Sequence, residues 1–170
     1  MSYINLTQGY KAQVDKDMFE CLDQNKWFAV VSGRTHNRVY ACRKVKGKRR
    51  WLAHVVMGVS SEFLKKNGLV VDYINHDTLD NRRCNLRFAT KSQDQMNTIG
   101  LKKRVNKRQA STSSFKGVSW STRYGLWKAS IHVDNKEIYL GRYVDEREAA
   151  RMYNVAALFY YKAYATLNPL

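Results

Sequence analysis

Residues 127–134 alternate strictly between apolar and polar side chains. The apolar positions are Trp127, Ala129, Ile131 and Val133. A period of two residues is typical of a strand with one buried and one exposed face. Asp134 and Asn135 favour a tight turn, and residues 137–141 provide the strand that returns from it. With residues 115–120 as a first strand, the pattern predicts a three-stranded antiparallel sheet.

After this sheet the apolar period changes to that of a helix. The positions that share one helical face are Ala149, Tyr153, Ala156, Ala157 and Tyr160. Asp145 is a suitable N-cap, and Glu148 three residues later completes a capping-box pattern. We therefore predict one helix that lies across the sheet, and its alanines allow a close approach.

The first half of the chain also contains short apolar runs that predict strands and helices. The expected strands lie near residues 4–6, 12–14, 27–31 and 38–42, and the expected helices lie over 17–22 and 51–58. Residues 100–114 have no apolar period and no acid, which is typical of a linker. We predict an α+β chain with domains over residues 1–99 and 115–170, joined by this basic linker.

The chain is strongly basic. Its 170 residues include 30 Lys and Arg against 14 Asp and Glu, a net charge of +16 with a pI near 9.9. Such an excess favours a polyanionic partner, with nucleic acid first and an anionic membrane surface second. No apolar run reaches the ~18 residues of a membrane span, and no amphipathic basic helix is visible. We therefore expect a nucleic-acid partner and no membrane association.

The three cysteines, Cys21, Cys42 and Cys84, are widely spaced and form no CxxC pair. This spacing predicts reduced thiols and argues against a zinc site or a disulfide framework. Because no signal peptide begins the sequence, we expect a cytoplasmic protein of a bacterial or phage-infected host cell.

Residues 68–97 combine a strand, a polar loop and a polar segment able to form a helix. The apolar run 68–71 brings Asp72 to the end of the predicted strand. This frame resembles the HNH (ββα-metal) nuclease finger, whose homing-endonuclease members read D-H-x-x-x-x-x-x-D-N-R-x-x-N-L-R. The matching residues are Asp72, Asp80, Asn81, Arg82, Asn85, Leu86 and Arg87. The chain departs from the pattern at Tyr73, where the family has His.

The resemblance implies a site that cleaves a phosphodiester with one divalent cation, commonly Mg²⁺, and a His that takes a proton from water. It makes Asp72 the first metal ligand, Asp94 the second and Asn85 the central Asn of the loop. Tyr73 stands at the general-base position, but a phenol with a pKa of roughly 10 is poorly matched to neutral pH. His54, which also belongs to the resemblance, and His76 are the nearby imidazoles that could substitute. A packing role for His54 and a surface role for His76 remain open.

The carboxy-terminal segment resembles the plant ethylene-response-factor (AP-two) DNA-binding domain. The stretches that carry the likeness are residues 115–118, 127–131, 139–143, 148–153 and 165–169. The resemblance implies that the sheet, not the helix, enters the major groove of double-stranded DNA. It selects the sheet face opposite the helix, with hairpin residues beside it: Lys116, Arg123, Tyr124, Lys128, Ser130, His132 and Tyr139. Trp127 is expected in the core.

Other basic residues are expected to contact DNA phosphates. Lys48, Arg49 and Arg50 fall in a loop expected over residues 44–50, for which a merely solvated turn is the alternative. Arg82 and Arg87 belong to the finger. The linker contributes Lys102, Lys103, Arg104, Lys107 and Arg108.

The order of the two modules resembles HNH homing endonucleases of phages and mobile introns. It implies a sequence-selective DNA-binding protein with metal-dependent nicking activity. The alternative is a catalytically inactive DNA-binding, regulatory or accessory protein, because Tyr73 replaces the general base. We expect a monomer, and a dimer remains open.

Overall fold

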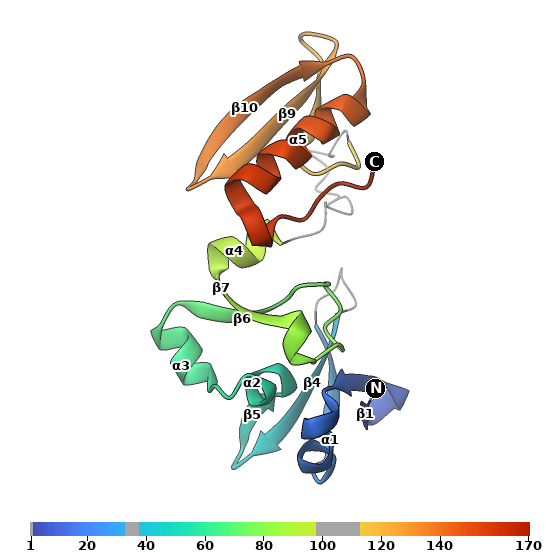
Figure 1. Cartoon of the computed structure of the whole chain (residues 1–170), viewed down its shortest axis with the longest axis vertical. Helices are drawn as coiled ribbons and strands as arrows, with labels where there is room; N and C mark the ends of the chain where they lie inside the picture. Colours follow the sequence, from blue (N-terminus) through green and yellow to red (C-terminus); the bar gives the residue numbers. More distant parts are fainter. Residues whose placement is uncertain (1, 33–37, 98–112) are drawn as a thin grey trace. The chain divides into compact units, whose positions relative to one another are not determined.

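The computed structural model describes residues 2–32, 38–97 and 113–170 (Figure 1). The chain divides into two compact units, Met1–Ser92 and Gln93–Leu170. The boundary falls inside helix α4 (Lys91–Met96). The predicted α+β class is confirmed. Most of the predicted linker, including all five of its basic residues, lies outside the described residues. Among the residues that the structure describes, no helix is long and apolar enough to cross a membrane.

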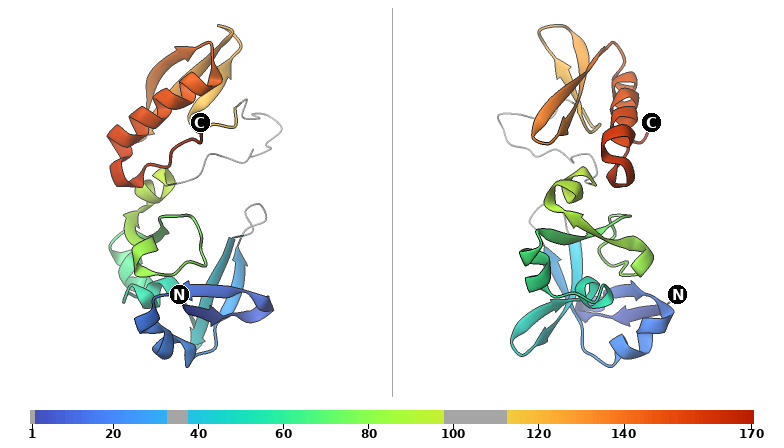
Figure 2. Two further views of the ribbon diagram at one scale, coloured as in Figure 1. Left: turned by 45° about the vertical axis from the view of Figure 1, so that its right-hand side comes forward. Right: turned by 60° about the vertical axis from the view of Figure 1, so that its left-hand side comes forward.

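The first unit contains two small antiparallel sheets in its amino-terminal part (Figure 2). The strands are β1 (Ser2–Asn5), β2 (Lys11–Val14), β3 (Phe28–Ser32), β4 (Arg38–Val45) and β5 (Lys48–Trp51). They pair as β1-β2 and as β3-β4-β5. A short 3-10 helix η1 (Thr7–Gly9) and helix α1 (Lys16–Asp23) connect them, so the strands and the helix expected from the apolar runs are present.

The basic stretch expected as a loop over residues 44–50 is instead a β-hairpin, so that prediction was wrong. Strand β4 continues to Val45, and β5 already begins at Lys48. Lys46 and Gly47 alone make the turn, with φ values of 47° and 76°. Two adjacent residues with positive φ form the tight turn that suits hairpin twist, and glycine supplies one of them at no steric cost.

The core of the first unit gathers around Trp27, which is 1% exposed. Ile4, Val14 and Leu52 are equally inaccessible and come from β1, β2 and α2 (Leu52–Val56). Helix α3 (Ser61–Lys66) follows and was not predicted. The Ser60 hydroxyl caps α3 by accepting a hydrogen bond from the Phe63 N–H at 3.0 Å. Its six residues are too few to show a clear apolar period.

The second unit is a three-stranded antiparallel sheet with one long helix packed on it, as predicted. The strands are β8 (Val118–Ser121), β9 (Leu126–Val133) and β10 (Lys136–Tyr143), in the order β10-β9-β8. Helix α5 (Glu146–Tyr161) covers one face of the sheet (Figure 2). The Asp145 side chain caps it by accepting from the Arg147 N–H at 2.9 Å. The chain ends after a 3-10 turn η3 (Lys162–Tyr164).

Small residues set the close approach of α5 to the sheet. Ala149, Ala150 and Ala157 are fully buried, and the partly buried Trp127 packs against the cluster that includes two of them. Gly117 has a φ of +73°, and a Cβ there would lie 2.0 Å from the Tyr153 ring. Glycine is therefore required at position 117 by both backbone conformation and space.

Candidate functional site

The finger begins with an ion pair between its two strands. Strands β6 (Leu69–Tyr73) and β7 (Leu86–Thr90) pair antiparallel, and Asp72 lies directly opposite Arg87. The Arg87 Nε donates to Asp72 Oδ2 at 2.7 Å, and Asp72 is only 4% exposed. A short charge-assisted bond in a buried setting compensates the carboxylate and fixes its orientation. Arg87 is thus held inside the finger, and its contact with phosphate stays a prediction.

Asn85 holds the polar loop between the two strands, as the resemblance implied. It ends the 3-10 turn η2 (Arg83–Asn85) and is buried. Its Nδ2 donates to the Asp80 carbonyl at 2.8 Å, and its Oδ1 accepts from the Asn75 N–H at 2.9 Å. One side chain therefore satisfies backbone groups on both arms of the loop, which keeps the loop in one conformation.

Asp80 is the second anchor of the loop. Its carboxylate accepts from Arg82 Nε at 2.8 Å, from Arg82 Nη2 at 2.7 Å and from Asn75 Nδ2 at 2.9 Å. The bonds from Arg82 are the main reason that the pKa of Asp80 lies below its usual value. Arg82 is engaged in this bidentate pair, so its role in binding phosphate also stays a prediction.

The amino-terminal hairpin supports this loop through contacts that the sequence did not reveal. The Gln13 N–H donates to the Leu79 carbonyl and the Asn81 N–H to the Gln13 carbonyl, each at 2.8 Å. The Arg83 N–H donates to Asp15 Oδ2 at 2.8 Å, and Arg83 Nη1 lies 2.8 Å from Asp17 Oδ2. Partners more than sixty residues apart leave no local pattern by which they could be found.

Tyr73, where the resemblance implies a general base, is a hydrogen-bond donor. Its hydroxyl donates to Asn81 Oδ1 at 3.3 Å, and its ring meets the Tyr40 ring edge-on at 6.2 Å between centroids. Burial raises the pKa of Tyr73 well above its ordinary value. The phenol therefore keeps its proton at neutral pH and cannot serve as a proton acceptor there.

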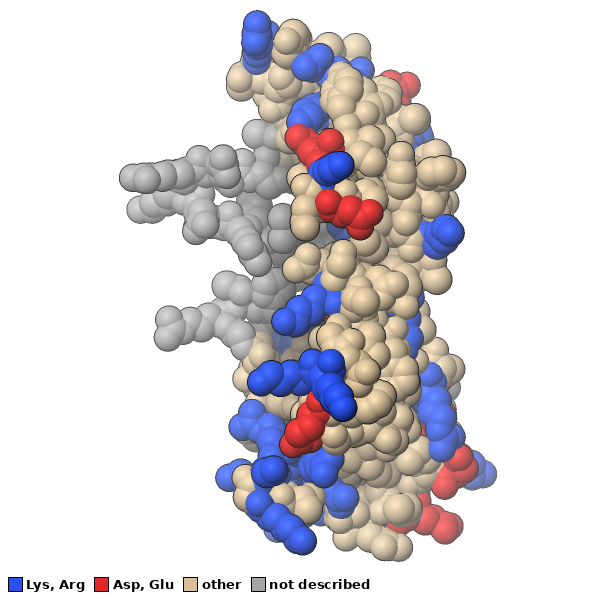
Figure 3. Space-filling model, turned by 90° about the vertical axis from the view of Figure 1, so that its left-hand side faces the viewer, with Lys and Arg blue, Asp and Glu red and all other residues tan. Residues whose placement is uncertain are grey.

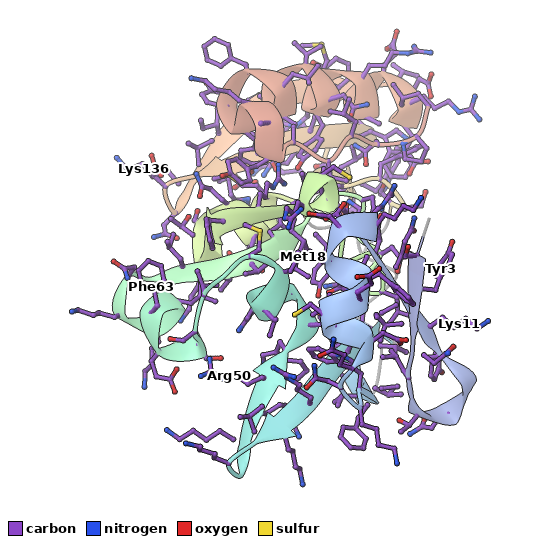
Figure 4. All side chains as sticks on the ribbon, turned by 60° about the horizontal axis from the view of Figure 1, so that its bottom comes forward. Tyr3, Lys11, Met18, Arg50, Phe63 and Lys136 are labelled. Atoms are coloured by element: carbon purple, nitrogen blue, oxygen red, sulfur yellow. The ribbon has the colours of Figure 1, made fainter. Side chains whose placement is uncertain are left out.

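The structure brings His54 to the same pocket as Tyr73. The pocket has a volume of about 280 Å³, and its lining consists of Ser32, Tyr40, Trp51, Ala53, His54, Val71 and Tyr73. His54 Nδ1 is hydrogen-bonded to Ser61 Oγ at 3.2 Å. Burial, and then the charge of Arg50 on β5 (labelled in Figure 4), lower the pKa of His54. His54 is therefore a neutral imidazole at pH 7, able to accept a proton.

His76 is placed differently. It lies in the turn after β6 with a φ of 66°, and its N–H donates to the Tyr73 carbonyl at 3.0 Å. A positive φ is uncommon outside glycine and marks a residue that shapes a tight turn. A turn-forming role therefore accounts for His76, while its catalytic role stays a prediction.

The residues implied as metal ligands have the chemistry that Mg²⁺ prefers. Mg²⁺ takes oxygen donors and uses one or two protein carboxylates, with water and phosphate completing its shell. Asp72 offers a carboxylate oriented by Arg87, and Asp94 is an exposed carboxylate on α4. Among the residues that the structure describes, no group of three or more His, Cys, Asp and Glu forms a metal cluster. Asp72 is thus one oriented carboxylate of the kind that such an ion uses, and the part of Asp94 as a second ligand stays a prediction.

The sheet of the second unit leaves one face uncovered by α5, which we call the outer face. Residue pairing puts Ser130 opposite Tyr139 and His132 opposite Glu137 on it. Lys128 is on the same face, and its Nζ lies 2.6 Å from Glu137 Oε1. This acidic partner was not among the residues predicted for the sheet. The expected residues Arg123 and Tyr124 lie in the turn between β8 and β9.

Lys116, which we expected at the DNA surface, makes its contacts inside the second unit. Its Nζ donates to the Met96 carbonyl at 2.7 Å and lies 5.9 Å from the centroid of the Tyr161 ring. Burial lowers the pKa of Lys116 to about 8. The Asn168 side chain binds both backbone groups of Lys116. Its Oδ1 accepts from the Lys116 N–H at 2.7 Å, and its Nδ2 donates to the Lys116 carbonyl at 3.0 Å. A DNA contact by Lys116 stays a prediction.

Cationic side chains gather on part of the first unit (Figure 3). Lys48 and Arg49 are exposed on β5, and Arg49 Cζ lies 5.2 Å from the centroid of a Trp51 ring. Arg50 is partly buried on the same strand.

All three cysteines are free, as predicted.

Comparison with known proteins identifies one segment of the chain, residues 52–96. Residues 52–96 match a protein family described as HNH endonuclease. The matched range contains His54, Asp72, Tyr73, Asn85 and Asp94. No curated protein matches the chain. Residues 52–96 are therefore an HNH endonuclease domain, which implies kinship with DNA-binding nucleases, while the likeness of the second unit to the plant domain remains a resemblance.

Proposed function

We propose that this protein binds double-stranded DNA with sequence selectivity. In this proposal the HNH domain contacts the sugar–phosphate backbone, and the outer face of the β8–β10 sheet reads base edges in the major groove. The observation that carries it is the arrangement of the sheet: α5 covers one face, while Lys128, Ser130, His132 and Tyr139 share the other. The major groove admits β-structure as well as a helix, and polar side chains there distinguish all four base pairs.

The charge of the chain supports DNA as the partner. The first unit carries exposed cations on β5, next to the HNH domain. Lysine and arginine contacts to phosphate release bound counterions, so affinity falls steeply with salt. Such contacts position a protein on the duplex, whereas contacts to base edges determine sequence selectivity.

The state of Tyr73 favours binding over efficient cleavage. The hydroxyl is already a donor to Asn81 Oδ1, in a pocket with aromatic side chains. A general base must instead accept a proton from water at the operating pH. The HNH domain would then serve mainly to hold the duplex.

Metal-dependent nicking is the second candidate, and the pocket shared by His54 and Tyr73 favours it. His54 is a neutral imidazole there and can accept a proton from water at a ring nitrogen, with Ser61 fixing the ring. Asp72, oriented by Arg87, would hold the cation, which supplies charge neutralisation at the phosphate when bound. One such site cuts one strand at a time, so a single copy would nick.

Selection of duplexes from a random pool, followed by fluorescence anisotropy, tests the binding proposal. We expect the selected duplex to bind more tightly than random DNA, with an affinity that falls as salt rises. Lys128→Ala and His132→Ala should weaken binding to the selected duplex more than binding to random DNA. Tighter binding to single strands or to anionic vesicles than to any duplex would contradict the proposal.

A plasmid that carries the selected site tests the second candidate. The full chain is incubated with Mg²⁺ or Mn²⁺ beside Asp72→Ala and His54→Gln. Nicking by the natural chain that is lost in both variants supports cleavage with His54 as the base. Nicking that survives His54→Gln but needs Asp72 would leave cleavage standing and remove His54 from it.

A further inference from the structure

A β-bulge in β10 decides which face of the sheet Arg142 occupies. Up to Tyr139, β10 pairs regularly with β9, and Tyr139 lies opposite Ser130 on the outer face. The register then shifts, so that Arg142 lies opposite Lys128. Strict alternation from Tyr139 would point Arg142 toward α5, but the extra residue of a bulge reverses the alternation. Arg142 therefore belongs to the outer face.

Gly141 makes this bulge possible. It has a φ of +130°, and a Cβ there would lie 2.7 Å from the Tyr143 hydroxyl. That backbone region is almost confined to glycine, because other residues clash with their own main chain. The placement of Arg142 is thus built into the backbone and does not depend on a flexible side chain.

Two tyrosine rings hold the Arg142 guanidinium. Its Cζ lies 3.8 Å from the centroid of the Tyr124 ring and 5.3 Å from that of the Tyr139 ring. The two rings remain 49% and 52% exposed, so the cluster faces solvent. Stacking of this kind orders a long side chain before any ligand arrives, which lowers the entropy lost on binding.

Arg142 differs from the other cation on this face. Lys128 is paired with Glu137 at 2.6 Å, whereas no carboxylate is paired with Arg142 in the described part of the chain. Of the residues in β8, β9 and β10, all of which are described, Arg142 is the only arginine. The outer face therefore presents one planar donor group whose charge is not neutralised by a neighbouring acid.

We propose that Arg142, held between Tyr124 and Tyr139, is a guanine-reading site. The inference rests on the proposed function, because it requires the outer face to enter the major groove. An arginine fork donates two parallel hydrogen bonds to O6 and N7 of guanine, the commonest specific contact in that groove. Lysine carries the charge without the fork and cannot make the same pair of bonds.

The test uses the duplex that the full chain selects. Its guanines are replaced one at a time by 7-deazaguanine, which removes the N7 acceptor and keeps Watson–Crick pairing. Fluorescence anisotropy then gives the affinity of the natural chain, Arg142→Lys and Arg142→Ala for each duplex. Arg151→Ala is the matched control, because Arg151 is an exposed arginine on α5, away from the outer face.

We expect one guanine at which 7-deazaguanine weakens the natural chain by about 10- to 100-fold. The same replacement should hardly change the affinity of either Arg142 variant, because the hydrogen bond to N7 is already absent in them. Arg142→Lys should keep its affinity for random DNA and lose most of its preference. Tyr124→Phe should behave as the natural chain, whereas Tyr124→Ala should lose part of the preference.

Two results overturn the inference, and they are distinguishable. If the natural chain prefers no duplex over another, the proposed function fails and the guanine site fails with it. If the natural chain is selective but every 7-deazaguanine effect persists in Arg142→Lys, only the guanine site fails. Thermal unfolding of each variant identifies any loss of affinity caused by misfolding. If Arg142→Ala does not fold, Arg142→Lys still tests the inference, because it keeps the apolar stem and the charge.

Discussion

Asp72 and Arg87 face each other across the β6–β7 hairpin, with Arg87 Nε 2.7 Å from Asp72 Oδ2. The pair joins the residue implied as first metal ligand to the last residue of the family pattern. A carboxylate held by a buried partner has one orientation, and such partners tune how a ligand meets a metal. The same pair also contributes to the stability of the first unit.

Loss of Arg87 should therefore destabilise the fold. We expect Arg87→Ala to cost about 3 kcal/mol, because it leaves the Asp72 carboxylate buried without its partner. Urea unfolding measures the cost, and the double variant Asp72→Ala with Arg87→Ala should recover part of it. Lys128→Ala is the control, since it breaks the more exposed pair with Glu137 and should cost less than about 1 kcal/mol. Equal losses of stability in Arg87→Ala and Lys128→Ala would contradict the prediction.

Replacement of Tyr73 by histidine should restore a general base to the HNH domain. We expect the natural chain to nick its selected site weakly at most, and Tyr73→His to nick it about 100-fold faster with Mg²⁺. The physical reason is that an imidazole accepts a proton near neutral pH, while the buried phenol of Tyr73 does not. The measurement is the rate of plasmid nicking, with Tyr73→His plus Asp72→Ala as the control. Silence of Tyr73→His on a bound plasmid would mean that more than the base has been lost.

Gly117 should be intolerant of any side chain. We expect Gly117→Ala to destabilise the second unit by more than about 2 kcal/mol, because the new methyl group overlaps the Tyr153 ring and the φ is positive. Gly125→Ala is the matched control: its φ is +63°, but nothing lies within 4 Å of the new Cβ. It should cost only about 1 kcal/mol, from backbone strain alone. Thermal or denaturant unfolding compares the two, and similar losses would argue against close packing at Tyr153.

Lys116 should make the stability of the second unit depend on pH. Its pKa is about 8 in the fold against 10.5 for the ordinary side chain. Between these values the unfolded chain holds the proton and the folded chain does not, so a rise in pH favours folding. We expect a gain of about 1 kcal/mol between pH 8 and 10, about half of what the full shift would give over that range, because Lys116 is partly exposed.

Denaturant unfolding across that pH range measures the effect of Lys116. Lys116→Met is the control, because it keeps the apolar stem and removes the titrating group. The other titrating side chains are common to both proteins, so the difference between the two profiles reports on Lys116. Parallel profiles for the natural chain and Lys116→Met would contradict the prediction.

The sequence by itself determined the class of the fold and most of its elements. The alternation over 127–134 and the helical period after Asp145 each reflect one buried face. A half-buried strand has an apolar residue at every second position, and a helix has one at every third or fourth position. The resemblance of residues 72–87 to the HNH pattern likewise located the finger, since the residues of one hairpin are close in the chain. Local chemistry of this kind is readable without coordinates.

Only the tertiary structure decided how the candidate sites are assembled. The support of the polar loop by Gln13, the meeting of His54 with Tyr73 in one pocket, and the engagement of Lys116 with Met96 join residues that are distant along the chain. Arg142 was missed for a different reason. A single bulged residue reverses the alternation of a strand, so the face of every later side chain depends on hydrogen-bond register, which the pattern of apolar residues does not record.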